Sequence, residues 1–107
     1  STMNYDVDAY WAKVAAVREA LAEAKPSTAA EVIAILRKHD PMTVYLTGDA
    51  FYSGSGDGGD LGEDLEDAGW SYVWAASDYY YVIRHEGTGE ALTYIEGDVY
   101  AGDKRPR

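Results

Sequence analysis

The side chains with the clearest chemical potential in this sequence are carboxylates, which are clustered in one short segment. Between residues 57 and 67 there are six of them and no basic residue. On a short helix, side chains three or four positions apart are neighbours, so these carboxylates repel one another and favour a cationic partner. The alternative is a solvated acidic face that only keeps the protein in solution. The candidate partner-binding carboxylates are Asp57, Asp60, Glu63, Asp64, Glu66 and Asp67.

Aromatic residues follow this acidic segment directly. Exposed Tyr and Trp side chains beside carboxylates can contact Arg and Lys through buried area and through cation–π attraction. Strict alternation along a strand puts Tyr79 and Tyr81 on one face and Tyr80 on the other, and puts Trp74 on the same face as the aromatic residues at 70 and 72. Because a two-layer domain buries one face of its sheet, we expect some rings to remain available. The candidate contact aromatics are Trp74, Tyr79 and Tyr81.

Other chemistries find weaker support. The glycine-rich stretch 54–61 resembles a calcium loop in composition, but its acids do not follow the EF-hand spacing. His39 and His85 each precede an acid, yet neither repeats at a metal-ligand spacing, and we expect both to be exposed at the ends of elements. There is no cysteine, no Gly-x-Ser-x-Gly elbow and no phosphate-binding loop. We therefore predict no catalytic residue, no metal site and no cofactor, and keep a small enzyme or a calcium-binding module as less favoured alternatives.

The distribution of charge narrows the class of partner. The chain has 107 residues, enough for one domain, and a net charge of −10. Residues 41–103 hold thirteen acids against one base, whereas residues 1–40 hold six acids and five bases. Such a chain is unsuited to direct binding of nucleic acid or an anionic membrane, because phosphate binding depends on Lys and Arg. The absence of cysteine, of a signal peptide and of a long apolar run predicts a cytoplasmic protein.

Two helices are predicted in the first forty residues. From residue 6 to residue 24 apolar positions recur in steps of three and four, which predicts an amphipathic helix. After Pro26, the pattern Thr28-x-x-Glu31 predicts a capping box. In this motif the threonine oxygen accepts the backbone amide of the glutamate, and the glutamate side chain accepts the backbone amide of the threonine. A second helix therefore runs from residue 29 to residue 38, and the short connection makes the pair an antiparallel hairpin.

The remaining elements are mostly strands. We expect strands at residues 43–47, 70–76, 79–85, 91–96 and 98–101, and a mobile glycine-rich loop at residues 49–59. A short acidic helix follows that loop, anchored by Leu61, Leu65 and Ala68 and ended by Gly69. Residues 1–5 and 103–107 are expected to be frayed.

These patterns predict a single α+β domain, with a helical hairpin packed on an antiparallel meander of four to five strands and an acidic helix inserted after the first strand. The function they favour is a small, acidic, non-catalytic binding protein. Its partner would be a basic protein, such as a nucleic-acid-binding enzyme, which it would inhibit or regulate. Phage anti-defence and host-takeover proteins, DNA mimics, antitoxins and immunity proteins act in this way. The alternative is a structural accessory subunit that forms a homodimer through its aromatic strands.

Overall fold

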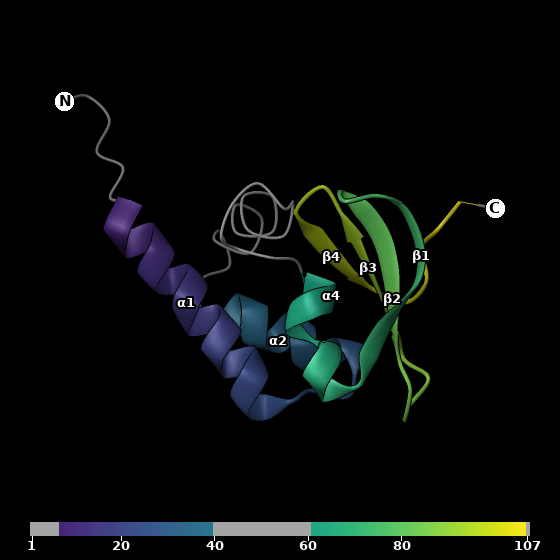
Figure 1. The fold of residues 1–107 in the computed structure, drawn as a ribbon, viewed down its shortest axis with the longest axis horizontal. Coiled ribbons are helices and arrows are strands. Elements are labelled where there is room, and N and C mark those ends of the chain that lie inside the picture. Colours follow the sequence, from purple (N-terminus) through teal and green to yellow (C-terminus); the bar gives the residue numbers. More distant parts are fainter. Residues whose placement is uncertain (1–6, 40–60, 107) are drawn as a thin grey trace.

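The computed structural model describes residues 7–39 and 61–106, and it shows an α+β fold (Figure 1). The predicted strand at 43–47 and the glycine-rich loop at 49–59 lie outside these residues. In the described parts, no helix combines the length and the apolar character needed to cross a membrane. The elements are α1 (Val7–Ala24), α2 (Ala29–His39), α4 (Leu61–Asp64), the 3₁₀ helix η1 (Glu66–Ala68), β1 (Trp70–Ser77), β2 (Tyr80–His85), β3 (Ala91–Ile95) and β4 (Asp98–Ala101).

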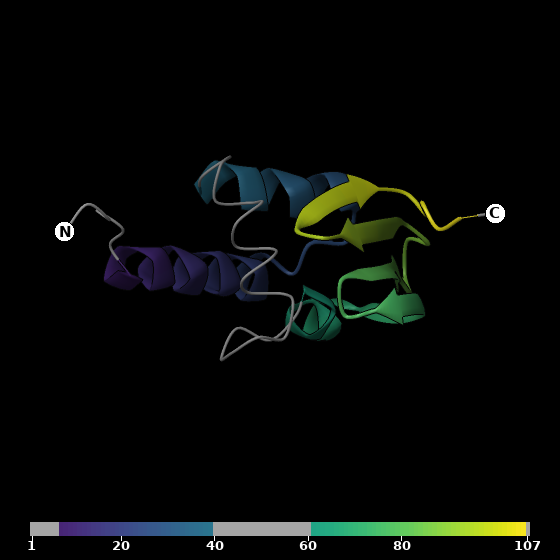
Figure 2. The ribbon, with the colours of Figure 1, turned by 90° about the horizontal axis from the view of Figure 1, so that it is seen from above.

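Helices α1 and α2 form the predicted antiparallel hairpin and lie side by side (Figure 2). Their buried positions follow the helical period, with Val14, Val17 and Leu21 on α1 and Val32 and Leu36 on α2. Helix α2 packs against β4 and helix α1 packs against α4, while the N-terminal half of α1 extends beyond the rest of the molecule (Figure 1). The hairpin therefore covers one face of the sheet, as predicted.

The N-terminus of α2 is capped by two parts of the chain. The amide of Glu31 donates to Thr28 Oγ1 at 3.2 Å, as the capping box predicts. The Glu31 carboxylate does not complete the predicted box, because it accepts the Thr28 hydroxyl instead, at 2.8 Å. Glu90, in the turn between β2 and β3, accepts the amide of Ala29 at 3.1 Å. A carboxylate at this end also suits the helix dipole, so Glu90 ties the sheet to the hairpin.

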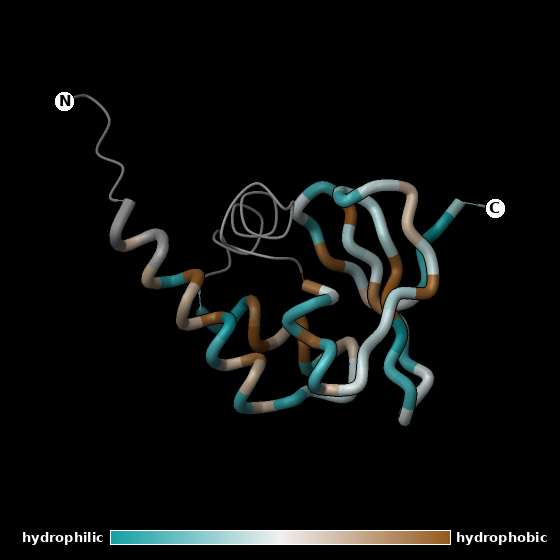
Figure 3. Tube along the Cα trace, in the orientation of Figure 1, coloured by the Kyte–Doolittle hydropathy of each residue, from teal (hydrophilic) through white to brown (hydrophobic). Residues whose placement is uncertain are grey.

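The four strands form an antiparallel meander in the order β1-β2-β3-β4. The face toward the helices carries Tyr81, Ile83, Leu92 and Tyr94, all buried, and the rings of Tyr81 and Tyr94 stack at 4.9 Å. Hydrophobic residues recur along the helices and the central strands, whereas the turn between β2 and β3 is hydrophilic (Figure 3). Trp70, at the start of β1, is buried in this core and donates its indole N–H to the carbonyl of Pro26 at 2.8 Å.

Strand β1 does not alternate strictly. Tyr72 pairs with Ile83, but the next pair along the hairpin is Trp74 with Val82, so Val73 is an extra residue and forms a β-bulge. The prediction that Trp74 shares a face with Trp70 and Tyr72 is therefore wrong. A one-residue shift turns every following side chain to the other face. Trp74 consequently lies on the face away from the helices, where its ring meets that of Tyr80 edge-on at 4.9 Å. A second irregularity follows between residues 75 and 77.

The face away from the helices is crossed by residues 102–106, which we call the C-terminal strap. Thr93 and its neighbour Val82 point to this face, yet both are fully buried. The Thr93 hydroxyl donates to the carbonyl of Gly102 at 2.7 Å and accepts the amide of Lys104 at 2.8 Å. The Tyr80 hydroxyl donates to the carbonyl of Lys104 at 3.0 Å. In place of the frayed end that the sequence suggests, residues 102–104 are attached to the sheet.

Candidate partner-binding site

The acidic segment lies on α4 and η1, held to the body by two leucines. Leu61 and Leu65 are fully buried, as predicted. Gly69 ends η1 with a left-handed backbone (φ 99°), which glycine adopts without strain. Of the six predicted carboxylates, Glu63, Glu66 and Asp67 are exposed on this segment, while Asp57 and Asp60 lie outside the described residues.

Asp64 is not part of an uncompensated acidic face. Its carboxylate accepts a hydrogen bond from the guanidinium of Arg18 at 3.2 Å, and its side chain is only 9% exposed. The packing of α1 on α4 brings these two residues together, although they stand 46 positions apart. Its charge is matched within the molecule by Arg18, and the contact of Asp64 with a partner stays a prediction.

The structure separates the three predicted contact aromatics. Tyr79, in the turn between β1 and β2, is 46% exposed and available for contact. Trp74 is half-buried against Tyr80, on the face that the strap crosses. Tyr81 is only 2% exposed, because its strand position points toward the helices and its ring stacks in the core. Tyr81 therefore presents almost no surface in this structure, and its contact with a partner stays a prediction.

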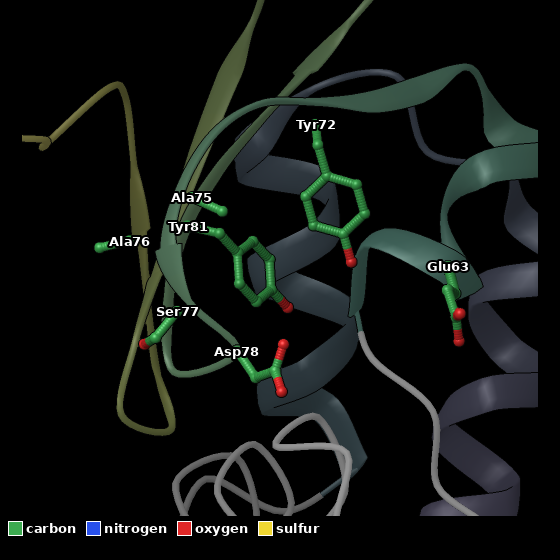
Figure 4. Close-up of a pocket in the computed structure, with 7 residues that line it drawn as sticks. All are labelled: Glu63, Tyr72, Ala75, Ala76, Ser77, Asp78 and Tyr81. Carbon is green, nitrogen blue, oxygen red and sulfur yellow. The ribbon is translucent and has the colours of Figure 1, made fainter.

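A pocket of about 380 Å³ opens between α4 and the hairpin of β1 and β2 (Figure 4). Two of its walls are aromatic: the rings of Tyr72 and Tyr81 meet edge-on at 5.2 Å, and Tyr72 is 45% exposed. Two of its lining residues, Glu63 on α4 and Asp78 in the hairpin turn, are carboxylates. None of the described residues that line it is basic. The lining residues are Glu63, Tyr72, Ala75, Ala76, Ser77, Asp78 and Tyr81.

Two small residues shape this pocket, one in its lining and one through the position of the Tyr72 ring. Ala75 pairs with Tyr81 across the hairpin and shares its face, so a larger side chain at this position would fill the hollow. Gly62 is buried against Tyr72, and a Cβ atom there would collide with the end of the tyrosine ring. Glycine at this position therefore lets the ring lie against α4.

Sequence reasoning missed Tyr72, Ala75 and Asp78 as site residues. Strict alternation puts Tyr72 on the face of Trp70 and Trp74 and does not single it out. Asp78 falls in the predicted turn between two strands. The available signal is a pair of alanines, with an acid two residues later, inside a run rich in aromatic residues. Small residues among large ones indicate a hollow, and the acid gives that hollow a negative charge.

His85 is half-buried rather than exposed, and both of its ring nitrogens are engaged. Nδ1 accepts the amides of Gly87 and Thr88 at 3.0 and 3.1 Å, so the proton lies on Nε2, which donates to the carbonyl of Ala68 at 2.8 Å. The ring also meets Trp70 edge-on at 5.4 Å. Within residues 7–39 and 61–106 no three His, Cys, Asp or Glu side chains are grouped so that they could hold a metal ion. His85 thus joins η1 to the turn after β2.

Replacing His85 with phenylalanine should lower the free energy of unfolding by about 1–3 kcal/mol, because a ring of similar shape keeps the contact with Trp70 but leaves three backbone groups without their partner. Urea denaturation followed by circular dichroism measures this. The control is His39→Phe at the C-terminal end of α2, which should change stability by less than about 0.5 kcal/mol. Equal stabilities of the two variants would show that the His85 hydrogen bonds contribute nothing.

Comparison of the chain with models of known protein families, with curated proteins and with solved structures found no match. Function must therefore be inferred from the charges, rings and cavity of the molecule itself. The exposed groups near α4, η1 and the hairpin of β1 and β2 form what we call the acidic–aromatic surface. It consists of Glu63, Glu66, Asp67, Tyr72, Asp78 and Tyr79.

Proposed function

We propose that the protein is a small, non-catalytic binding protein whose acidic–aromatic surface docks on a basic protein and so inhibits or regulates it. The observation that supports this most is the coincidence of exposed carboxylates with exposed tyrosines on one set of neighbouring elements. A basic surface that could receive these carboxylates is typical of proteins that handle nucleic acid, because such proteins bind phosphates with Lys and Arg. The carboxylates of this protein would take the place of the phosphates.

The negative charge is concentrated on this half of the molecule. Residues 61–106 carry ten acids and three bases, whereas residues 7–39 carry four acids and five bases. The three bases are Arg84, Lys104 and Arg105, of which Arg84 and Arg105 pair with Asp103 of the strap at 3.7 and 2.7 Å. All three bases lie on or near the face of the sheet that is turned away from the helices. A field of one sign around the acidic–aromatic surface accelerates encounters with a basic partner.

The exposed tyrosines add short-range contact energy to the long-range attraction between charges. Tyr72 and Tyr79 each expose nearly half of their surface. Tyrosine is enriched among the residues that dominate binding energy, and it attracts arginine and lysine through its ring face. The carboxylates then contribute association rate and selectivity, while the rings contribute a slow dissociation.

The same surface is poorly suited to a homodimer. In a twofold-symmetric interface each patch meets its own copy, so Glu63, Glu66, Asp67 and Asp78 would face identical carboxylates. Like charges brought together across an interface are unfavourable. The charge pattern therefore favours a basic partner over a second copy of this chain, which was the structural alternative.

The experiment compares two variants with the same change in net charge. The first is Glu63→Gln, Glu66→Gln, Asp67→Asn and Asp78→Asn; the control is Glu19→Gln, Glu23→Gln, Glu86→Gln and Glu96→Gln, all exposed positions elsewhere. A partner is first captured from lysate with the intact protein, and its affinity for each variant is then measured by calorimetry at low and high salt.

We expect the first variant to bind about tenfold or more weakly and to lose most of the salt dependence, with the control within about twofold of the intact protein. Equal affinities of the two variants, or an affinity of the intact protein that does not depend on salt, would contradict the proposed function.

A further inference from the structure

We propose that His85 makes the junction between η1 and the turn after β2 sensitive to acid: the junction holds while the imidazole is neutral and opens when the ring takes up a proton. The turn consists of residues 86–90. Imidazole is the side chain that ordinarily gains its charge between about pH 8 and pH 5. The junction therefore responds to a modest fall in pH, over which ordinary carboxylates and lysines keep their charges.

The neutral ring fits the junction through both of its nitrogens. Nδ1 accepts the amides of Gly87 and Thr88 at 3.0 and 3.1 Å, and Nε2 donates to the carbonyl of Ala68 at 2.8 Å. Imidazolium carries a proton on each nitrogen and accepts no hydrogen bond. Protonation of His85 thus points one N–H group at two others, and the hydrogen bonds to the turn must break.

The main chain leaves the protonated ring little room to adjust. A Cβ atom at Gly69 would lie 2.8 Å from Nε2, and one at Gly87 would lie 3.0 Å from Cε1, so the backbone approaches the ring closely at both glycines. Trp70 meets the ring edge-on at 5.4 Å. Turning the ring over gives no relief, because both nitrogens of imidazolium are donors. The turn itself must move away from Nδ1.

The charges on the elements around His85 favour the cation once the turn has moved. These elements carry four acids and two bases, and an excess of negative charge stabilises imidazolium. The backbone amides at Nδ1 oppose the proton, so its uptake and the opening of the turn are coupled. The charged residues are Glu66 and Asp67 on η1, Arg84 and Glu86 on either side of His85, Glu90 at the end of the turn, and Lys25 in the connection between α1 and α2.

The turn joins three parts of the fold, so its opening has effects beyond the ring. The Thr88 hydroxyl donates to the carbonyl of Ser27 at 2.7 Å, in the connection between α1 and α2. The carboxylate of Glu90 caps α2. The amide of Glu86 donates to the carbonyl of Gly69 at 2.9 Å, at the end of η1. We expect acid to weaken these contacts together.

The test follows the intact protein by NMR from about pH 7.5 to about pH 5.5. The ring shifts of His85 report its protonation, and the amide shifts of Gly87 and Thr88 report the two hydrogen bonds. We expect all of these signals to change with one midpoint, and both amides to move toward the shifts of an unstructured chain. The other histidine, His39, is the internal control, because its protonation should leave the two amides unchanged.

A second measurement separates the charge of the ring from its hydrogen bonds. His85→Asn keeps an acceptor oxygen near the position of Nδ1 but cannot be protonated. Because only the neutral ring fits, its contribution to stability is complete at the higher pH and is lost as the pH falls. We expect the urea midpoint of the intact protein to fall by about a tenth or more between the two pH values, and that of His85→Asn by less than about half as much. The matched control His39→Asn should behave like the intact protein.

Three results would overturn the acid-sensitive junction. The first is protonation of His85 with unchanged amide shifts of Gly87 and Thr88, and the second is a ring that stays neutral over the whole range. The third is an equal fall in the urea midpoint of the intact protein and of His85→Asn. If His85→Asn does not fold, the titration of the intact protein decides alone. The proposed function can fail without affecting this inference, because neither measurement needs a partner.

Discussion

Replacing Trp70 with alanine will lower the free energy of unfolding by about 3–5 kcal/mol, the usual cost of removing a large buried aromatic side chain. Trp70 is 1% exposed and contacts His85, which itself joins η1 to the turn after β2. Its indole also holds the carbonyl of Pro26, in the connection between α1 and α2. The substitution therefore removes one side chain that links three parts of the fold.

Trp70→Phe separates the two contributions. It keeps most of the apolar contact but leaves the Pro26 carbonyl without its donor, so we expect a loss of about 1–3 kcal/mol. The control is Val73→Thr on the same strand, where the side chain is exposed and the change should stay within about 0.5 kcal/mol. Urea denaturation followed by circular dichroism measures all three. Similar stabilities of Trp70→Ala and Val73→Thr would show that the core is not organised around Trp70.

Ending the chain after Gly102 will lower the free energy of unfolding by about 2–3 kcal/mol. The truncation removes the two hydrogen bonds that Lys104 makes with Thr93 and Tyr80, each contributing about 0.5–1.5 kcal/mol, and it exposes part of Val82. A strap that merely lay on the surface would give no change in urea denaturation.

A double-mutant cycle assigns this effect to the strap's contact with the sheet. Thr93→Val keeps the shape of the side chain but removes the hydroxyl that joins Gly102 to Lys104. If the strap acts through Thr93, this substitution will cost clearly less in the truncated protein than in the full chain. Equal costs in the two proteins would mean that Thr93 and the strap contribute independently.

The strap's contribution should also depend on pH in one direction. Hydrogen bonds from Arg105, with a smaller contribution from the charge of Arg84, hold the pKa of Asp103 below its usual value of 3.8. A lowered pKa in the folded state stabilises the protein above the unfolded pKa, and this part is lost as the pH falls through the lowered value. The difference in stability between the full and truncated chains should therefore be constant near neutral pH and shrink below about pH 4.

The sequence predicted the elements of the described regions because their signals are local. Hydrophobic steps of three and four marked α1, the capping box marked the start of α2, and Gly69 marked the end of η1. Glu96 and Gly97 both adopt a positive φ between β3 and β4, and a glycine in such a two-residue turn is a recognisable hairpin signal. Strand β4 was predicted with its observed bounds.

The candidate site was harder to predict because it depends on contacts between distant residues. Nothing near Asp64 in the sequence indicates that Arg18 neutralises it. The strap has no periodicity, and its attachment to Thr93 follows from the path of the chain after β4. The bulge at Val73 could not be seen either, because the residues around it suit a regular strand equally well. Each of these changed which side chains are available to a partner.

That bulge also bears on how relatives of this protein could be recognised and on how the site could evolve. Deleting the extra residue would keep Trp74 opposite Val82 and Ala75 opposite Tyr81, whereas a regular register that includes Val73 would reverse the facing of both and place an indole ring beside Tyr81. A one-residue slip of β1 against β2 would thus fill the hollow, with the same composition and nearly the same fold. A homologue should therefore be judged by whether a small residue stands opposite its equivalent of Tyr81 before its overall identity is considered.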